Sequence, residues 1–225
     1  MITEIQQIDL LTLSSAALLI ATFGVLVRRS FVGWLSAYRY QSIVLAAVTT
    51  LIAYTTGVWE IYPAAALTLA IKAEIIPRVL VWATRNIKGE FKVETNPYVS
   101  FRLSLLISAV LVVLSYGLTE QILANSNLDK VSVTYIPVSI SLFFIGLFVM
   151  VSRRMALSQV VGLLILENGL FLFTTALTPG VSLMIEIGIL LDIMVGVMIS
   201  SILLFRITQT FDTLDIGNLE KLRDD

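Results

Sequence analysis

Seven long apolar stretches constrain what this sequence can fold into, because a helix needs about 20 apolar residues to cross a bilayer. The chain has 225 residues, 57% of them apolar and 14% charged, which is too apolar for a soluble domain. We expect an all-α integral membrane protein with seven transmembrane helices. The expected spans are 10–27, 34–58, 61–82, 103–123, 135–151, 156–177 and 181–205. Six spans are the alternative, because only Gly57 to Pro63 separate the second and third stretches.

The basic residues of the expected loops support seven spans. Lys130 is the single Lys or Arg in the loops expected outside. The remaining loops and the tail hold Arg28, Arg29, Arg85, Lys88, Lys92, Arg102, Arg153, Arg154, Arg206, Lys221 and Arg223. By the positive-inside rule, we expect an inner (cytoplasmic) membrane protein with its N-terminus outside and its C-terminus in the cytoplasm. The first span is not expected to be a signal peptide, because acidic residues precede it and Arg28 and Arg29 follow it.

The sequence also contains a weak internal repeat. Arg28 and Arg29 align with Arg153 and Arg154 at an offset of 125 residues, and the same offset aligns Thr49-Thr50 with Thr174-Thr175. Two three-span units can share one orientation only if an extra span separates them. We therefore expect a parallel repeat of 3+1+3 helices, in contrast to an inverted transporter repeat. The expected units are residues 1–90, a linker helix with its loops at 91–134, and residues 135–225.

The absence of cysteine and histidine limits the chemistry of the chain. It excludes disulfides, thiolate zinc sites, iron–sulfur ligation and Ser-His or Cys-His nucleophiles. The formal net charge of −1 argues against nucleic acid as a partner. Any chemistry therefore falls to carboxylates, Lys and Arg.

Several ionisable residues lie inside the expected spans, where a charge costs at least about 2.5–3.5 kcal/mol. Arg39, Lys72, Glu74, Glu167 and Asp192 are expected in the middle third of the membrane, and Glu186 near its outer interface. A row of acids and bases at this depth suits proton relay through intervening water. These residues are our proton-path candidates, with Glu186 and Arg78 as secondary candidates.

Each candidate also has a structural interpretation. Glu74 and Arg78 are four residues apart and could form a plain ion pair. Arg39, with Tyr38, Tyr40 and Gln41, could be a buried hydrogen-bonding cluster that fixes helix packing.

Other candidates have no partner on their own helix. Lys72 faces away from Glu74 and needs a different partner. Glu167 and Asp192 have no basic neighbour on their helices, so they must be protonated, face water or pair across helices. Pro77 is expected to break the hydrogen-bond ladder of the third span within a turn of Glu74 and Arg78, where a freed carbonyl could hold a water or the helix could simply kink.

Three segments carry a family resemblance. GVLVRRSFVGWLSAYRYQSIVLA resembles the first loop and second helix of the K-type subunit of respiratory complex I and of the C subunit of Mrp-type antiporters. The second unit is closer, with RRMALSQVVGLLILENGLFLF and ILLDIMVGVMISSILLFR. Two such units in one chain resemble the hydrogenase-4 component E family, which belongs to group 4 energy-converting hydrogenases and formate hydrogenlyase-type complexes.

The resemblance implies proton-carrying acids on the second and third helices of each unit. The third-helix acid falls on Glu74 in the first unit and Asp192 in the second. The second-helix acid falls on Arg39 and Leu164, which are departures from the family pattern. Glu167, one turn further along, could replace the missing acid of the second unit, so proton transfer is better supported there.

The sequence and the resemblance together lead to one expected function with two alternatives. The expected function is a non-catalytic membrane subunit of a group 4 [NiFe] hydrogenase or formate hydrogenlyase-like complex, contributing to a midplane proton or sodium path. The resemblance implies antiporter-like and other complex I-like membrane subunits as partners. It also implies soluble hydrogenase and iron–sulfur subunits that hold the NiFe and iron–sulfur centres, with no cofactor in this chain. The alternatives are a subunit of a Mrp-like cation/proton antiporter and a purely structural membrane spacer.

Overall fold

The computed structural model describes residues 4–83, 97–123 and 129–178, and every regular element in these ranges is helical. The elements are α1 (Glu4–Leu26), α2 (Phe31–Thr56), α3 (Ile61–Leu67), the π-helix η1 (Thr68–Ile75), α4 (Ile76–Ala83), α5 (Phe101–Leu123), α6 (Lys130–Ser152) and α7 (Ala156–Leu177). Three of them, α3, η1 and α4, follow one another without a break and form one long helix.

Short polar signals begin and end these helices. The side chain of Ser30 accepts a hydrogen bond from Gly33 N–H at 3.2 Å and caps the start of α2. Asp129 caps α6 in the same way, accepting from Ser132 N–H at 3.1 Å. Gly57 ends α2 with a φ of 72°, a left-handed conformation that favours glycine. The tight turn expected between the second and third spans is therefore present.

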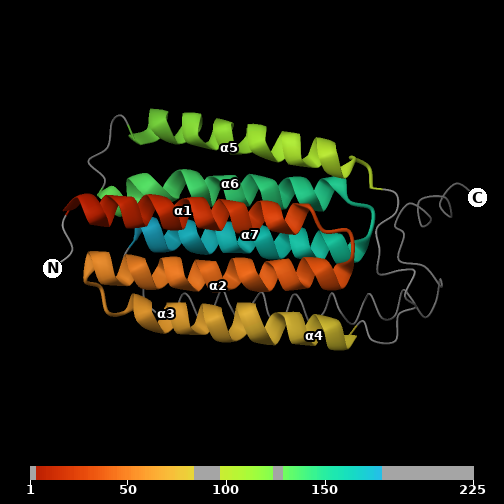
Figure 1. The fold of residues 1–225 in the computed structure, drawn as a ribbon, viewed down its shortest axis with the longest axis horizontal. Coiled ribbons are helices and arrows are strands. Elements are labelled where there is room, and N and C mark those ends of the chain that lie inside the picture. The colour runs from red at the N-terminus through yellow and green to blue at the C-terminus, as the bar shows by residue number, and fades with distance from the viewer. Residues whose placement is uncertain (1–3, 84–96, 124–128, 179–225) are drawn as a thin grey trace, which may run out of the picture.

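The helices lie side by side with their axes nearly parallel (Figure 1). Helix α5 lies at one edge of the bundle and packs on α6 and α1, whereas α3, η1 and α4 lie at the other edge beside α2. Helix α7 lies in the middle against α6 and α2. It is 67% buried over its apolar window, compared with 17% for α5. Residues on α7 are thus the best placed for interior chemistry.

Six of the seven expected spans coincide with helices or, in the third span, with the continuous α3–η1–α4 segment. Four helices, α1, α5, α6 and α7, are long and apolar enough to cross a membrane. The seventh span, 181–205, lies outside the described residues. The seven-helix 3+1+3 arrangement therefore stays a prediction, while the all-helical membrane architecture agrees with the sequence.

The third span is continuous but locally widened. In η1 the backbone bonds to the carbonyl five residues earlier, and Ile76 N–H at its end donates to the Ile71 carbonyl. Pro77 follows directly; its ring has no N–H to donate and would displace the carbonyl four residues before it in an α-helix. The wide turn accommodates this proline, so the α-helical hydrogen-bond ladder is broken next to Pro77, as expected, while the helix itself continues. It also carries Lys72 and Glu74, two of the candidate residues.

The two helix pairs α1–α2 and α6–α7 share local structure at the offset of 125 residues. The side chain of Trp34 donates to the Arg28 carbonyl, and that of Gln159, 125 residues later, donates to the Arg153 carbonyl. Likewise the hydroxyls of Thr49 and Thr50 bond to the carbonyls four residues earlier, and so do those of Thr174 and Thr175. These paired hydrogen bonds show that the offset read from the sequence also relates the local geometry of residues 28–50 to that of residues 153–175.

Three apolar cores fill the described part of the bundle, and two of them lie at its opposite ends. The basic-end core lies near the Arg28-Arg29 and Arg153-Arg154 turns and includes Trp34, Leu80 and Leu157. The opposite-end core includes Ile52, Ile61 and Ala176. Burial of these side chains supplies the packing of the bundle. The candidate site lies in the region between these two end cores.

Candidate functional site

A layer of buried polar side chains lies between the two apolar cores. On α2, for example, Tyr38 belongs to one core and Leu45 to the other, and Gln41 and Ser42 lie between them. We call this set the polar layer. Its members are Thr22 on α1, Gln41 and Ser42 on α2, Thr68 and Lys72 on η1, and Glu167 and Asn168 on α7. Each is at most 3% exposed, so four different segments contribute polar groups to the middle of an apolar bundle.

The centre of the polar layer is an ion pair between Lys72 and Glu167. The Lys72 Nζ lies 2.6 Å from Glu167 Oε1, and the two side chains are 0% and 4% exposed. The ammonium also lies 4.4 Å from the centre of the Phe171 ring, one turn along α7 from Glu167, which adds a cation–π contact. The structure thus supplies partners across helices for both residues. It joins the π-helical turn of the first unit to the second helix of the second unit.

The polar layer has more hydrogen-bonding capacity than its members use among the described residues. Gln41 Nε2 donates to Thr22 Oγ1 at 2.8 Å. The Gln41 Oε1, Ser42 Oγ, Thr68 Oγ1, Glu167 Oε2 and both side-chain amide atoms of Asn168 make no hydrogen bond within the described ranges. Buried polar groups are normally paired, with protein or with water. A layer with this composition can bind water beside the ion pair.

A second charged cluster lies on the outer face of α2, η1 and α4. Glu74 accepts from the guanidinium groups of both Arg39 and Arg78, one through each carboxylate oxygen. The side chains of Arg39, Glu74 and Arg78 are 52%, 27% and 74% exposed. The simple Glu74–Arg78 pair is therefore present, and Arg39 joins it.

The structure corrects the alternative interpretation of Arg39. Arg39 and Tyr40 are exposed, whereas Tyr38 and Gln41 are fully buried on the other side of α2. The four residues follow one another in sequence, and consecutive residues of a helix point in different directions. A single buried cluster of the four is therefore wrong.

The remaining acidic candidates, Asp192 and Glu186, lie outside the described residues. Within the described residues, no group of three or more His, Cys, Asp or Glu side chains could hold a metal ion.

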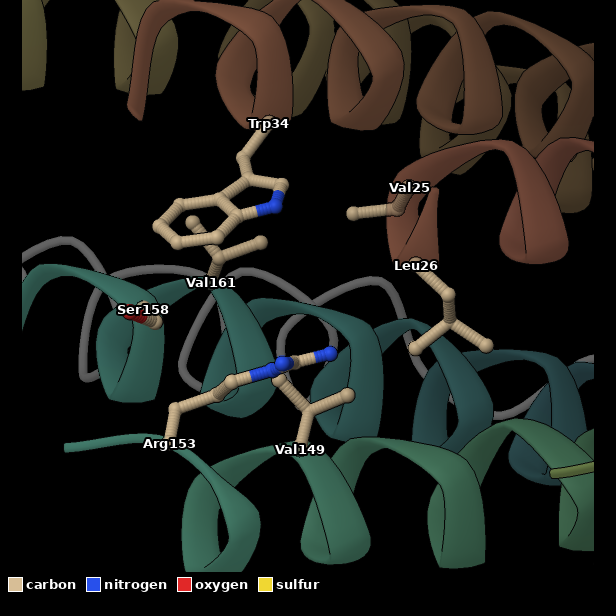
Figure 2. Close-up of a pocket in the computed structure, with 7 residues that line it drawn as sticks. All are labelled: Val25, Leu26, Trp34, Val149, Arg153, Ser158 and Val161. Carbon is tan, nitrogen blue, oxygen red and sulfur yellow. The ribbon is translucent and has the colours of Figure 1, made fainter. Parts of the chain in front are cut away.

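Arg153 is a buried residue whose role sequence reasoning missed. It was counted with the loop residues of the cytoplasmic side, but it is only 2% exposed and its guanidinium lies 4.4 Å from the centre of the Phe101 ring. Its Nη2 donates to Ser104 Oγ at 3.3 Å. Figure 2 shows this guanidinium below Trp34, beside a cavity of about 10 Å³. A space of that size holds one water molecule at most. Because Phe101 and Ser104 both belong to α5, the contacts of Arg153 anchor α5 to the bundle.

Comparison with known proteins finds a family model that matches part of the chain and relatives that match most of it. Residues 134–224 match the family model described as NADH-ubiquinone/plastoquinone oxidoreductase chain 4L. Hydrogenase-4 component E of Escherichia coli K12 is 25% identical over 186 residues, which cover 83% of this chain and 84% of the relative. The expected resemblance to the hydrogenase-4 component E family is confirmed. The family model matches the second unit, which is also the part whose sequence resembles the K-type subunit more closely.

The similarity extends over nearly the whole chain in another relative. An uncharacterized protein of Mycobacterium tuberculosis is 29% identical over 216 residues, which cover 96% of both chains. Hydrogenase-4 component E of Shigella flexneri matches to the same extent as the Escherichia coli protein. No solved structure matches the chain. Together with the apolar helices, these similarities support a multi-pass membrane protein that is similar to complex I-like membrane subunits.

Proposed function

We propose that this chain is a non-catalytic membrane subunit of a group 4 [NiFe] hydrogenase or formate hydrogenlyase-like complex, and that its polar layer forms part of a midplane proton path. The family relationship supports membership of a complex I-like or hydrogenase-type assembly. The NiFe and iron–sulfur centres would lie in partner subunits, because the chain has no Cys or His to hold them. Antiporter-like and other complex I-like membrane subunits would be its neighbours in the bilayer.

The observation that carries the proton path is the buried Lys72–Glu167 pair within the polar layer. A charge buried in low dielectric is stable only while its partner remains charged. A proton delivered to Glu167 would neutralise the carboxylate and weaken its hold on Lys72. The ammonium would then favour transfer of its own proton to water or a neighbouring group of the layer. Arrival of one proton is thereby coupled to departure of another.

The same pair favours the proton over sodium as the transported ion. The ammonium of Lys72 occupies the position beside Glu167 that a bound sodium ion would need. Sodium prefers several oxygen ligands, whereas a Lys–Glu pair needs only proton exchange to change its state. Glu74, with Arg39, and Asp192 would extend the path laterally toward partner subunits.

The test uses inverted membrane vesicles that contain the native complex, with formate or reduced ferredoxin as electron donor. Hydrogen evolution and proton uptake, followed with a fluorescent pH-gradient dye, are measured in parallel for Glu167→Gln and Lys72→Met. We expect both variants to lower the protons moved per hydrogen formed. Glu120→Gln is the matched control, because Glu120 is an exposed carboxylate on α5 outside the polar layer. Uptake of ²²Na⁺ separates the two ions.

The remaining outcomes decide between the alternatives. An unchanged ratio of protons to hydrogen in both variants, with intact assembly on native gels, would contradict the relay and support the structural spacer. A purified complex with antiporter-like subunits and no redox subunits would support the Mrp-like antiporter assembly.

A further inference from the structure

The outer face of the α2 and α3–η1–α4 pair carries charge at a depth where lipid cannot solvate it. Arg39 lies eight residues after the start of α2, and Glu74 nine residues before the end of α4, which are about 12 Å and about 14 Å along the helices. In the spans expected for these two segments, 34–58 and 61–82, both positions lie inside the hydrocarbon region of a bilayer about 30 Å thick. Yet the side chain of Arg39 is 52% exposed and that of Arg78 is 74% exposed.

The charges of this face do not balance. Glu74 is the one carboxylate that the described residues place against the two guanidinium groups, so the cluster of Arg39, Glu74 and Arg78 carries one excess positive charge. Each guanidinium has five N–H donors, and Glu74 offers a single carboxylate to both. The cluster therefore has unused donors directed to the outside of the bundle. A second carboxylate would neutralise the charge and accept from them.

The surroundings of the cluster suit a protein neighbour. Ile43 and Trp82, four residues beyond Arg39 and Arg78 on the same helix faces, are 40% and 69% exposed. Tyr40, beside Arg39, is 67% exposed. Exposed aromatic and apolar side chains around Arg residues are the composition of protein interfaces. Together these residues form a continuous face that we call the cationic face.

We propose that the cationic face is the docking site for a transmembrane helix of a partner subunit that presents an Asp or Glu to Arg39 and Arg78. This proposal rests on the membership of a complex proposed above, but it does not depend on proton transfer through Lys72 and Glu167. The excess positive charge of the cationic face favours a partner helix that carries a negative charge. A helix without a carboxylate would leave the excess charge buried and unpaired.

Lipid is the less favourable occupant. Arg78 lies five residues before the end of α4, about 8 Å, and a long side chain can reach the headgroups from there. Arg39 is deeper and pairs with Glu74, so a headgroup phosphate bound by Arg78 would balance the charge but would leave the remaining donors of Arg39 without an acceptor. A partner carboxylate at the depth of Glu74 reaches both.

The first test locates the neighbour of the cationic face in the intact complex. A photo-reactive phenylalanine analogue replaces Tyr40, and cross-linked peptides are identified by mass spectrometry. The matched control places the same analogue at Val110, which is 51% exposed and lies nine residues from the start of α5, as Tyr40 does from the start of α2. Helix α5 lies at the opposite edge of the bundle (Figure 1). We expect the Tyr40 position to cross-link an apolar partner segment that contains Asp or Glu, and the Val110 position to miss that segment.

The second test reverses the charge. We expect Arg39→Glu to lower copurification of the cross-linked partner about tenfold or more, because a like charge then faces the partner carboxylate. Arg39→Lys should retain copurification, and replacing the partner carboxylate with Arg should restore it in Arg39→Glu. A thermal melt of each purified variant in detergent shows whether the chain itself still folds.

Three outcomes would overturn the proposal. They are adducts at position 40 with lipid alone, with a second copy of this chain or with residues 179–225 of the same chain. Unchanged copurification of the partner by a folded Arg39→Glu variant would also overturn it. A cross-linked, charge-dependent partner combined with unaltered proton transport in Glu167→Gln would support the docking site while contradicting the proton path, so the two proposals fail separately.

Discussion

Lys72 and Glu167 form a buried ion pair, 2.6 Å from Nζ to Oε1, that links the π-helical turn η1 to α7. The two residues are 95 positions apart in the sequence and come from different units. Apolar cores lie on both sides of them along the bundle, and the layer between these cores also holds Thr22, Gln41 and Asn168. The pair thus connects two helices that are far apart in the sequence, and its Lys72 side chain is fully buried.

The first prediction concerns the stability of this pair. Lys72→Met leaves Glu167 buried without its cation, so we expect a loss on the order of 3–5 kcal/mol in unfolding free energy. The double variant Lys72→Met/Glu167→Leu removes both charges, and we expect it to recover most of that loss. The measurement is thermal unfolding of the purified protein in mild detergent for the two single variants and the double variant. Equal losses in the single and double variants would show that the pair contributes through its packing and not through its charges.

The second prediction concerns the close approach of α6 and α7. A Cβ at Gly146 would lie 2.7 Å from the Gly162 carbonyl oxygen, and a Cβ at Gly162 would lie 2.8 Å from Met150 N. The contacted atoms belong to the backbone and cannot rotate away. We therefore expect Gly146→Ala and Gly162→Ala each to destabilise the bundle by about 1–3 kcal/mol, measured by the same detergent melts.

Gly24 and Gly117 are the matched controls for these variants. A Cβ at either position meets nothing within 4 Å, and both glycines lie within helices. Alanine should therefore be neutral or slightly stabilising there. Destabilisation at all four positions to the same degree would contradict the close-packing interpretation.

The sequence identified the charged candidates but could not pair them. Helix rise places Lys72 and Glu167 at similar depths. Lys72 needs a partner other than Glu74, whereas Glu167 could be protonated, face water or pair across helices. Their pairing depends on the rotation and order of helices in the bundle, which no local pattern specifies. Asn168 and Gln41 gave a usable signal, because each is an amide inside a long apolar run.

Two residues were assigned to the wrong environment for physical reasons. Arg153 was expected among loop charges, and the structure buries it because the Phe101 ring and Ser104 replace its water. Arg39 was considered for a buried cluster, and the structure leaves it exposed because Glu74 on the neighbouring segment is its partner. In both cases the deciding partner lies on another helix. Likewise, Pro77 alone does not predict that a π-helical turn precedes it and accommodates its ring.

The third prediction concerns the ring that joins α5 to the rest of the bundle. The guanidinium groups of Arg29 and Arg153 lie 5.2 Å and 4.4 Å from the centre of the Phe101 ring. Phe101→Leu keeps an apolar side chain but removes both cation–π contacts, so we expect a loss of about 1–2 kcal/mol in the detergent melt. Phe101→Trp should retain most of the stability. Leu103→Ala, at an exposed position of the same helix, is the control and should change little.

A loss in Phe101→Leu that persists when Arg153 is replaced by Met would contradict the cation–π interpretation. In the Arg153→Met variant, the Phe101 ring has already lost the closer of its two cations. The remaining effect of Phe101→Leu should then be smaller than in the otherwise unchanged chain.

The last prediction separates transport from stability at Asn168. This side chain is fully buried, and neither amide atom has a hydrogen-bond partner in the described part of the chain. Replacing such a group by an apolar side chain of similar size costs little stability, because no described hydrogen bond is lost. We therefore expect Asn168→Leu to melt at or above the temperature of the unchanged protein.

If the polar layer conducts protons through water beside Glu167, the same variant should slow proton uptake per hydrogen formed in inverted vesicles. Thr175→Val is the control, because Thr175 is buried outside the layer and bonds only to the Phe171 carbonyl of its own helix. Destabilisation of Asn168→Leu with undiminished transport would contradict the prediction and assign Asn168 to helix packing.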